Sequence, residues 1–220
     1  MVGERSFGEC TALQSVSLPS TVIKLGDCAF FGCTNLVEVR LNEGLITVGR
    51  GTFANCALRS VTIPSTVTML GLCAFLGCSN LLEVQLKDGL EVVGKCAFQD
   101  CTALRSVTIP STVTSLGHGV FAGCSSLGEV QLNEGLLTIG AWAFYVCTAL
   151  RSVALPSTVN TLGQYAFHGC RNLVKVQLNE GLEVVGESTF HSCTAFQSVT
   201  TPSTVKSLGH GAFFGCSNLV

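Results

Sequence analysis

A 23-residue repeat runs through almost the whole chain and restricts what it can fold into. The nine full units begin at Leu13, Leu36, Leu58, Leu81, Leu104, Leu127, Leu150, Leu173 and Phe196. The second unit lacks one residue, between Cys56 and Ala57. A partial unit (1–12) precedes the nine units of 13–218, and 219–220 begin another. Periodicity of this length indicates one solenoid array over residues 1–220, in which each unit packs only against its neighbours.

Two kinds of unit alternate along the array. Type A units contain a proline followed by Ser-Thr-Val, and type B units contain an acidic residue followed by Gly-Leu. Two 23-residue units therefore make a larger period of 46 residues. This period indicates that a pair of units was duplicated.

Each unit has the same apolar skeleton, at repeat positions 1, 4, 6, 10, 13, 18 and 21. In the fifth unit these positions are Leu104, Val107, Ile109, Val113, Leu116, Phe121 and Cys124. Positions 4 and 6 alternate with polar positions 3 and 5, which predicts a strand. Stacked units should pair these strands in parallel and in register, about 4.8 Å apart. Identical side chains then form columns along the axis.

The second half of each unit predicts a corner and a short helical turn. Position 14 is glycine in every unit, which we interpret as a corner that needs an unusual backbone conformation. The following segment, Ala-Phe-x-Gly-Cys in the most regular units, places Phe and Cys three residues apart. That spacing suits a helical turn that directs both side chains inward.

The pattern resembles the BspA-type leucine-rich repeats, whose unit runs roughly LxxIxLPxxLxxIGxxAFxxCxxL. The residues that carry the resemblance are the Gly of position 14, the Phe and Cys columns, and the pairs Leu18-Pro19, Ile63-Pro64, Ile109-Pro110 and Leu155-Pro156. The resemblance implies an α/β repeat: a right-handed solenoid with a parallel sheet on its concave face and short strands or helical turns on its convex face. It also implies a microbial cell-surface or secreted protein that binds partner proteins, and it supplies no catalytic residues. Asn or Lys replaces the proline in alternate units, and Thr201 occupies an apolar position in the ninth.

Thirteen cysteines invite a disulfide or metal interpretation, but their positions favour packing. Ten occupy position 21 and should form one inward column: Cys10, Cys33, Cys56, Cys78, Cys101, Cys124, Cys147, Cys170, Cys193 and Cys216. Free cysteine behaves there as a small apolar side chain. The other three, Cys28, Cys73 and Cys96, occupy position 16. Cys73 and Cys96 are neighbours in that column and should be more exposed. In an oxidising compartment they are candidates for a disulfide.

The concave face is one candidate binding surface. Positions 3 and 5 should point outward from the sheet, where Glu83, Gln85, Glu129 and Gln131 form a polar groove for a peptide or glycan. The alternative is a solubilising ladder in which arginines such as Arg105 pair with glutamates of adjacent coils. Near-uniformity from coil to coil and the absence of aromatic residues favour the ladder.

The convex face is the second candidate. It holds the only tryptophan, Trp142, and both tyrosines, Tyr145 and Tyr165, in two consecutive units. With His168 they should form one patch, and aromatic rings with polar tips are typical binding anchors. The alternative is that these rings only cover the phenylalanine column. His168 and His191 lack the third ligand that a metal site needs.

Composition excludes several classes of function. The net charge of −2 argues against nucleic-acid or anionic-membrane partners. No apolar run approaches the roughly 18 residues of a membrane span. P-loop, GxSxG and HExxH motifs are absent, and nothing indicates a cofactor or a metal. Together with the partner binding that the family resemblance implies, these absences predict a non-enzymatic protein-interaction or adhesion scaffold. The alternative is a purely structural, self-associating segment of a larger protein without a specific ligand.

The termini carry two further expectations. The first residues lack the basic start and apolar stretch of a signal peptide, which predicts a cytoplasmic protein if the chain is complete. If the chain is a fragment of a longer family member, the expected location is the cell surface or outside the cell. Neither end has a polar capping unit, so we expect end-to-end association through unpaired strand edges.

Overall fold

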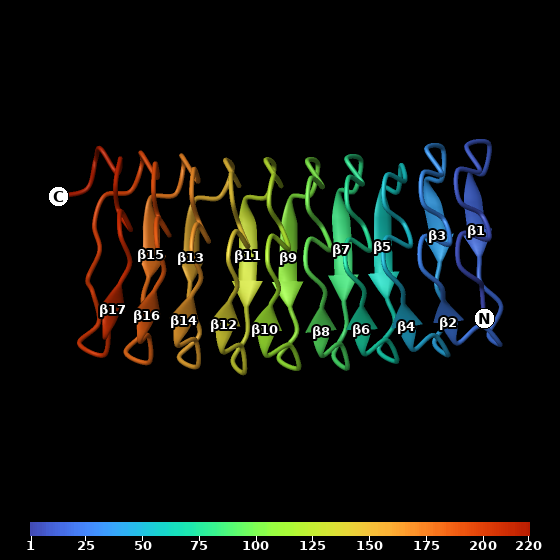
Figure 1. The fold of residues 1–220 in the computed structure, drawn as a ribbon, viewed down its shortest axis with the longest axis horizontal. Coiled ribbons are helices and arrows are strands. Elements are labelled where there is room, and N and C mark those ends of the chain that lie inside the picture. Colours follow the sequence, from blue (N-terminus) through green and yellow to red (C-terminus); the bar gives the residue numbers. More distant parts are fainter.

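The chain forms a solenoid with one coil per repeat unit, arranged in a row from the N-terminus to the C-terminus (Figure 1). The structure is a computed structural model that describes residues 1–220. One side, here called the main face, carries the strands of repeat positions 3 to 6. These strands are β1 (Ser15–Ser17), β3 (Glu38–Arg40), β5 (Ser60–Ile63), β7 (Glu83–Leu86), β9 (Ser106–Ile109), β11 (Glu129–Leu132), β13 (Ser152–Ala154) and β15 (Lys175–Gln177). The ninth unit has no strand here, where Thr201 replaces the apolar residue.

A second sheet runs along another side, the second face. Its two-residue strands are β2 (Lys24–Leu25), β4 (Thr47–Val48), β6 (Met69–Leu70), β8 (Val92–Val93), β10 (Ser115–Leu116), β12 (Thr138–Ile139), β14 (Thr161–Leu162), β16 (Val184–Val185) and β17 (Ser207–Leu208). All nine strands form one continuous sheet. Within a coil the two strands point in opposite directions (Figure 1). The short convex strands expected from the sequence are therefore present.

The register of the sheets confirms the predicted columns. Ser60 pairs with Glu83 and Val61 with Val84, so equal repeat positions lie opposite one another in parallel strands. The inward phenylalanines stack through ten coils with ring centroids 5.1 to 5.6 Å apart. Apolar residues of all the predicted positions merge into one core of 56 buried residues. A single unit could not bury this surface alone, which explains why the stack is the stable object.

The predicted helical turn is wrong, and with it the α/β class, because the structure contains no helix. Repeat positions 15 to 21 form a third side, the turn face. Each coil has left-handed residues at positions 16 and 20, with φ between 50° and 77°, and twelve of these residues are not glycine. These residues turn the backbone so that the N–H groups of positions 16, 18 and 20 point along the solenoid axis. In the third unit these groups belong to Cys73, Phe75 and Gly77, and they donate to the carbonyls of Lys95, Ala97 and Gln99 in the next coil. The N–H groups of Ala74, Leu76 and Cys78, between and after them, bond three residues back within their own coil.

The invariant glycine of position 14 has a different reason from the one predicted. None of these glycines lies in the left-handed region. Instead, adjacent backbones approach so closely that a side chain would not fit. A Cβ on Gly163 would lie 2.4 Å from the backbone nitrogen of Ala141 in the preceding coil. The column of glycines therefore allows the coils to stack at this corner.

Contacts between unlike units account for the alternation of types A and B. The side-chain amide of Asn42, in a type B unit, donates to the carbonyls of Pro19 and Val22 in the preceding type A unit. At a boundary of the opposite kind, Ser157 of a type A unit donates its hydroxyl to Glu134 of the preceding type B unit at 2.9 Å. Each type of unit thus supplies hydrogen-bond partners for polar groups of the other type.

The missing residue of the second unit is absorbed within one corner. Cys56 and Leu58, on either side of it, remain buried. The phenylalanines of the two coils still stack at 5.3 Å, and Thr47 of β4 still pairs with Met69 of β6. The deletion therefore changes neither the core nor the sheet register.

Candidate interaction surfaces

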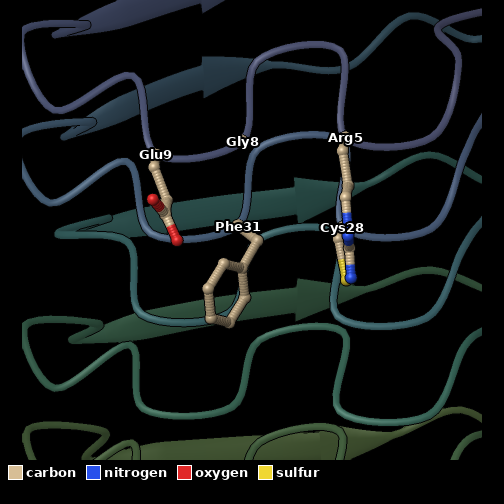
Figure 2. Close-up of a pocket in the computed structure, with 5 residues that line it drawn as sticks. All are labelled: Arg5, Gly8, Glu9, Cys28 and Phe31. Carbon is tan, nitrogen blue, oxygen red and sulfur yellow. The ribbon is translucent and has the colours of Figure 1, made fainter.

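The turn face presents the side chains of positions 16 and 19 outward, while those of positions 17, 18 and 21 point into the core. Figure 2 shows the angular path of the backbone on this face, repeated in register from coil to coil. A hollow of about 530 Å³ lies here between the first two coils, lined by Arg5, Gly8, Glu9, Cys28 and Phe31. Sequence reasoning did not single out this hollow. Its signal was the glycine at position 19 of the partial unit, which leaves the space beside Phe31 open.

The four aromatic residues predicted to lie together do form one patch on the turn face. The Trp142 ring centroid lies 4.6 Å from that of Tyr145 and 4.7 Å from that of Tyr165. Tyr145 stacks on His168 at 5.0 Å. His168 in turn stacks on His191 at 4.6 Å. We call Trp142, Tyr145, Tyr165, His168 and His191 the aromatic patch.

The patch extends further than the sequence suggested. Phe214 lies 5.0 Å from the His191 ring, and His118 lies 6.3 Å from Trp142. Phe214 and His191 occupy position 19, so reading this column through consecutive units would have found Phe214. The rings of the patch are partly exposed, whereas Phe144 beneath them is fully buried. The patch therefore covers the phenylalanine column and at the same time presents ring surface to solvent.

Two members of the patch have strained backbones. Trp142 and Tyr165 lie in the left-handed region, with φ of 63° and 56°. Bulky residues rarely adopt this conformation, which costs roughly 1–2 kcal/mol per residue. The equivalent residues in three other coils are Gly51, Gly119 and Gly211, which pay no such cost. Position 16 is left-handed in every coil and is not glycine in seven of the ten, so this strain is a property of the fold that Trp142 and Tyr165 share with other side chains.

Only some polar atoms of the patch have hydrogen-bond partners within the protein. The Tyr165 hydroxyl donates to the Glu187 carboxylate at 3.1 Å. Nδ1 of His168 is buried without any hydrogen-bond partner. Burial, together with the neighbouring His191 ring, lowers the pKa of His168 below its ordinary value. The surroundings of His168 therefore favour the uncharged form of its imidazole.

The second candidate surface lies on the main face, where Glu83, Gln85, Glu129 and Gln131 are exposed as predicted. Strand β9 separates the β7 pair from the β11 pair, because it pairs with both strands. Gln85 donates to Glu83 at 2.9 Å and accepts from Thr62 at 3.3 Å, and Gln131 accepts from Thr108 at 3.5 Å. A shallow groove of about 240 Å³ crosses β7 and β9.

The predicted arginine–glutamate pairs between coils of this ladder are wrong. The chain has only two ion pairs, Arg40–Glu38 within β3 and Lys206–Glu183 between neighbouring coils of the second face. Arg105 and its equivalents take part in neither. The ladder is held by neutral hydrogen bonds such as that between Thr62 and Gln85.

The cysteine column confirms the packing interpretation and adds a contact that the sequence did not suggest. Eight of its ten thiols are buried. Each cysteine from Cys33 to Cys216 donates its Sγ–H to the carbonyl of the phenylalanine in the preceding coil, at 3.0 to 3.3 Å. Burial raises the pKa of Cys78, Cys124 and Cys170 to about 12. The buried thiols of this column are therefore protonated and act as hydrogen-bond donors.

The position-16 cysteines differ from this column because they are only partly buried and no phenylalanine carbonyl accepts from them. Cys28, Cys73 and Cys96 all carry free thiols. The structure contains no group of three or more His, Cys, Asp or Glu side chains arranged to hold a metal ion. It also contains no helix of the length and apolar character needed to cross a membrane.

Comparison with known proteins shows which family and which solved structures have this architecture. Residues 1–127 and 91–220 match the pattern described as the BspA type leucine rich repeat region, in six copies. A leucine-rich repeat protein from Bacteroides ovatus superimposes with a TM-score of 0.70 at 26% identity, over 100% of this chain and 69% of that chain. A T. pallidum leucine-rich repeat protein has 31% identity and a TM-score of 0.62, over 78% of this chain and 70% of the other.

A third similar structure is a leucine rich cell surface protein from Faecalibacterium prausnitzii. It has 28% identity and a TM-score of 0.64, over 99% of this chain and 62% of that chain. A search of curated protein sequences finds no match.

Proposed function

Because the chain belongs to the BspA-type leucine-rich repeat family, we propose that it is a non-enzymatic scaffold that binds a partner protein through its aromatic patch. The observation that carries this proposal is the cluster of partly exposed rings, in which the centroid of Trp142 lies 4.6 Å from that of Tyr145 and 4.7 Å from that of Tyr165. Glycine, cysteine or serine occupies the position of Trp142 and Tyr165 in other coils, so the fold alone does not require a ring there.

The chemistry of the patch suits an extended peptide segment. Trp, Tyr and His combine ring faces for apolar contact with N–H and O–H groups for hydrogen bonds, which is the composition of binding anchors in protein interfaces. The five stacked or tilted rings span the coils from Trp142 to His191. A segment lying along the solenoid axis would therefore meet a ring in each coil that it crosses.

The main face supports a binding role less well. Its glutamines are already hydrogen-bonded to neighbouring side chains, as Gln85 is to Glu83 and Thr62, and the face lacks a ring that could anchor a partner. We therefore assign Glu83, Gln85, Glu129 and Gln131 a solubilising role.

We further infer a location at a cell surface. The similar Faecalibacterium structure is described as a cell surface protein, and adhesion is a use that such a location favours for a protein-binding scaffold. Localisation by immunostaining of intact, non-permeabilised cells of the source organism tests this inference. Staining only after permeabilisation would contradict it.

The binding test uses a random peptide library displayed on phage and selected on the full chain. A variant with Trp142→Gly and Tyr165→Gly removes both rings and substitutes a residue that the chain itself uses at this position. The matched control, Glu83→Ser with Glu129→Ser, places on the main face the serine that alternate units carry at position 3. We expect selected peptides to lose at least tenfold in affinity for the ring variant and to bind the control like the parent.

Other outcomes separate the alternatives. Peptides that bind the ring variant and the parent equally well would refute the patch as the site. A glycan array that binds the parent, with no peptide enriched, would replace the protein partner by a carbohydrate. Absence of any ligand, with concentration-dependent association in sedimentation, would favour the purely structural alternative.

A further inference from the structure

Three cysteines on the turn face share a position, but only two of them are neighbours. Cys28, Cys73 and Cys96 occupy position 16 with φ of 53°, 56° and 55°, so their backbones have the same conformation. All three side chains are partly exposed. Cys28 is followed in the next coil by Gly51 and Cys96 by Gly119, whereas Cys73 is followed by Cys96.

The contacts at Gly51 and Gly119 show where a position-16 side chain of the preceding coil points. The sulfur of Cys28 lies 3.3 Å from the place that a Cβ on Gly51 would occupy, and the sulfur of Cys96 lies 3.4 Å from that place on Gly119. Ser188 repeats this geometry, with its hydroxyl oxygen 3.4 Å from the Cβ place of Gly211. A side chain at position 16 therefore directs its terminal atom along the axis at the Cβ of the next coil.

The same geometry places the sulfur of Cys73 against the Cβ of Cys96. In a disulfide the sulfur of one residue lies roughly 3 Å from the Cβ of the other, given an S–S bond of about 2.05 Å. The separation measured at the two glycines is within a few tenths of an ångström of this value. The coil spacing of about 4.8 Å also lies within the usual Cα–Cα range of disulfides.

The structure assigns Cys73 and Cys96 as the one intramolecular thiol pair of this chain that an oxidant converts to a disulfide, which ties two adjacent coils together on the turn face. With a low-molecular-weight disulfide as oxidant, the thiolate of one cysteine attacks an oxidant sulfur and releases one reduced thiol. The second cysteine, once deprotonated by solvent, attacks the mixed disulfide and releases the other. Two protein thiols are oxidised, one external disulfide is reduced, and both protons end on the released thiols.

The other cysteines lack either access or a partner. The buried members of position 21 remain protonated and donate to phenylalanine carbonyls, so they do not supply the reactive thiolate. Cys28 is also partly exposed, but Gly51 in the next coil has no sulfur to pair with it. Cys28 therefore serves as the natural control for reactivity without pairing.

The test treats the folded full chain with oxidised glutathione, alkylates the remaining thiols and digests the product with trypsin. Peptide 60–87, which contains Cys73 and Cys78, should be linked to peptide 96–105, which contains Cys96 and Cys101. Of the thirteen cysteines, the other eleven should be found unlinked. A reductant should reverse the link.

Three variants identify which cysteines form the link. Cys73→Ser should abolish it, and this serine is tolerated because Ser188 has the same position and conformation in its own coil. The double variant Cys78→Ser, Cys101→Ser should retain the link, which excludes every pair that involves a column cysteine of these peptides, and Cys28→Ser should have no effect. Persistence of the link in the Cys73→Ser variant, or unlinked peptides 60–87 and 96–105 in the oxidised parent, would overturn the assignment.

Discussion

The column of buried thiols should make the protein unfold sharply in mild alkali. Seven cysteines have strongly raised pKa values because burial disfavours their thiolates: Cys56, Cys78, Cys101, Cys124, Cys147, Cys170 and Cys193. In the unfolded chain each thiol ionises near its ordinary pKa of 9.0, whereas for Cys124 the folded value is about 12. Between these values the folded state binds more protons than the unfolded state, so the free energy of unfolding falls as pH rises.

The size of the effect follows from the number of thiols. At pH 10, one unit above the unfolded pKa, each buried thiol lowers the free energy of unfolding by about 1.4 kcal/mol. Seven such thiols together lower it by roughly 10 kcal/mol, which is comparable to the total stability of a typical domain. Below pH 8 the thiols are protonated in both the folded and the unfolded state, so the stability that they contribute is fully present.

Urea unfolding at pH 8, 9 and 10, followed by circular dichroism under a reductant, measures this dependence. The double variant Cys101→Ala, Cys124→Ala should reduce the slope against pH by about two protons, although it lowers stability at pH 8. Cys28→Ser, which removes a partly exposed thiol, should leave the slope unchanged. Equal slopes in the parent and the double variant would refute the thiol column as the cause.

Other predictions concern the corner, the ring column and the patch. Gly163→Ala should destabilise the protein by about 1–3 kcal/mol in urea unfolding, because the new Cβ would lie 2.4 Å from a backbone atom of the preceding coil. Gly117→Ala, whose Cβ would lie 3.1 Å from its nearest neighbours, should destabilise it clearly less. Equal losses of stability would contradict the close-approach argument. Phe121→Ala should cost about 3–5 kcal/mol by the same measurement, and a cost below about 1 kcal/mol would indicate that the ring is not tightly packed. His168 is harder to protonate in the folded state than in the unfolded chain, so stability should fall as pH drops below about 6.5, and His168→Phe should remove that loss; an unchanged acid profile would contradict it.

The repeating apolar pattern was sufficient to predict the solenoid and its register. Val61 opposite Val84, and Phe98 stacked on Phe121, both follow from equal positions in successive units. The ring patch was also predictable, because Trp142 and Tyr165 occupy the same position of consecutive units. These features depend only on which residue stands at which repeat position.

The turn face could not be predicted in the same way. Phe121 and Cys124 stand three residues apart, a spacing typical of a helix, and the left-handed residues between the corners include Trp142 and Cys73, which rarely adopt that conformation. On the turn face, successive N–H groups donate alternately to the next coil and to their own coil. This pattern depends on how the coils stack, so a single unit does not reveal it. The thiol bond from Cys124 to the Phe98 carbonyl likewise depends on the offset between coils.

The shortened corner after Cys56 indicates where this array tolerates changes of length. Since one residue is missing there while Cys56 and Leu58 stay buried, the loop between position 21 and the next strand can vary without moving the core. The corner at position 14 has no such freedom, because neighbouring backbones touch there. Foreign peptide segments grafted after a column cysteine should therefore be displayed on the surface with the coils on both sides intact, which makes this corner the natural insertion point for engineering.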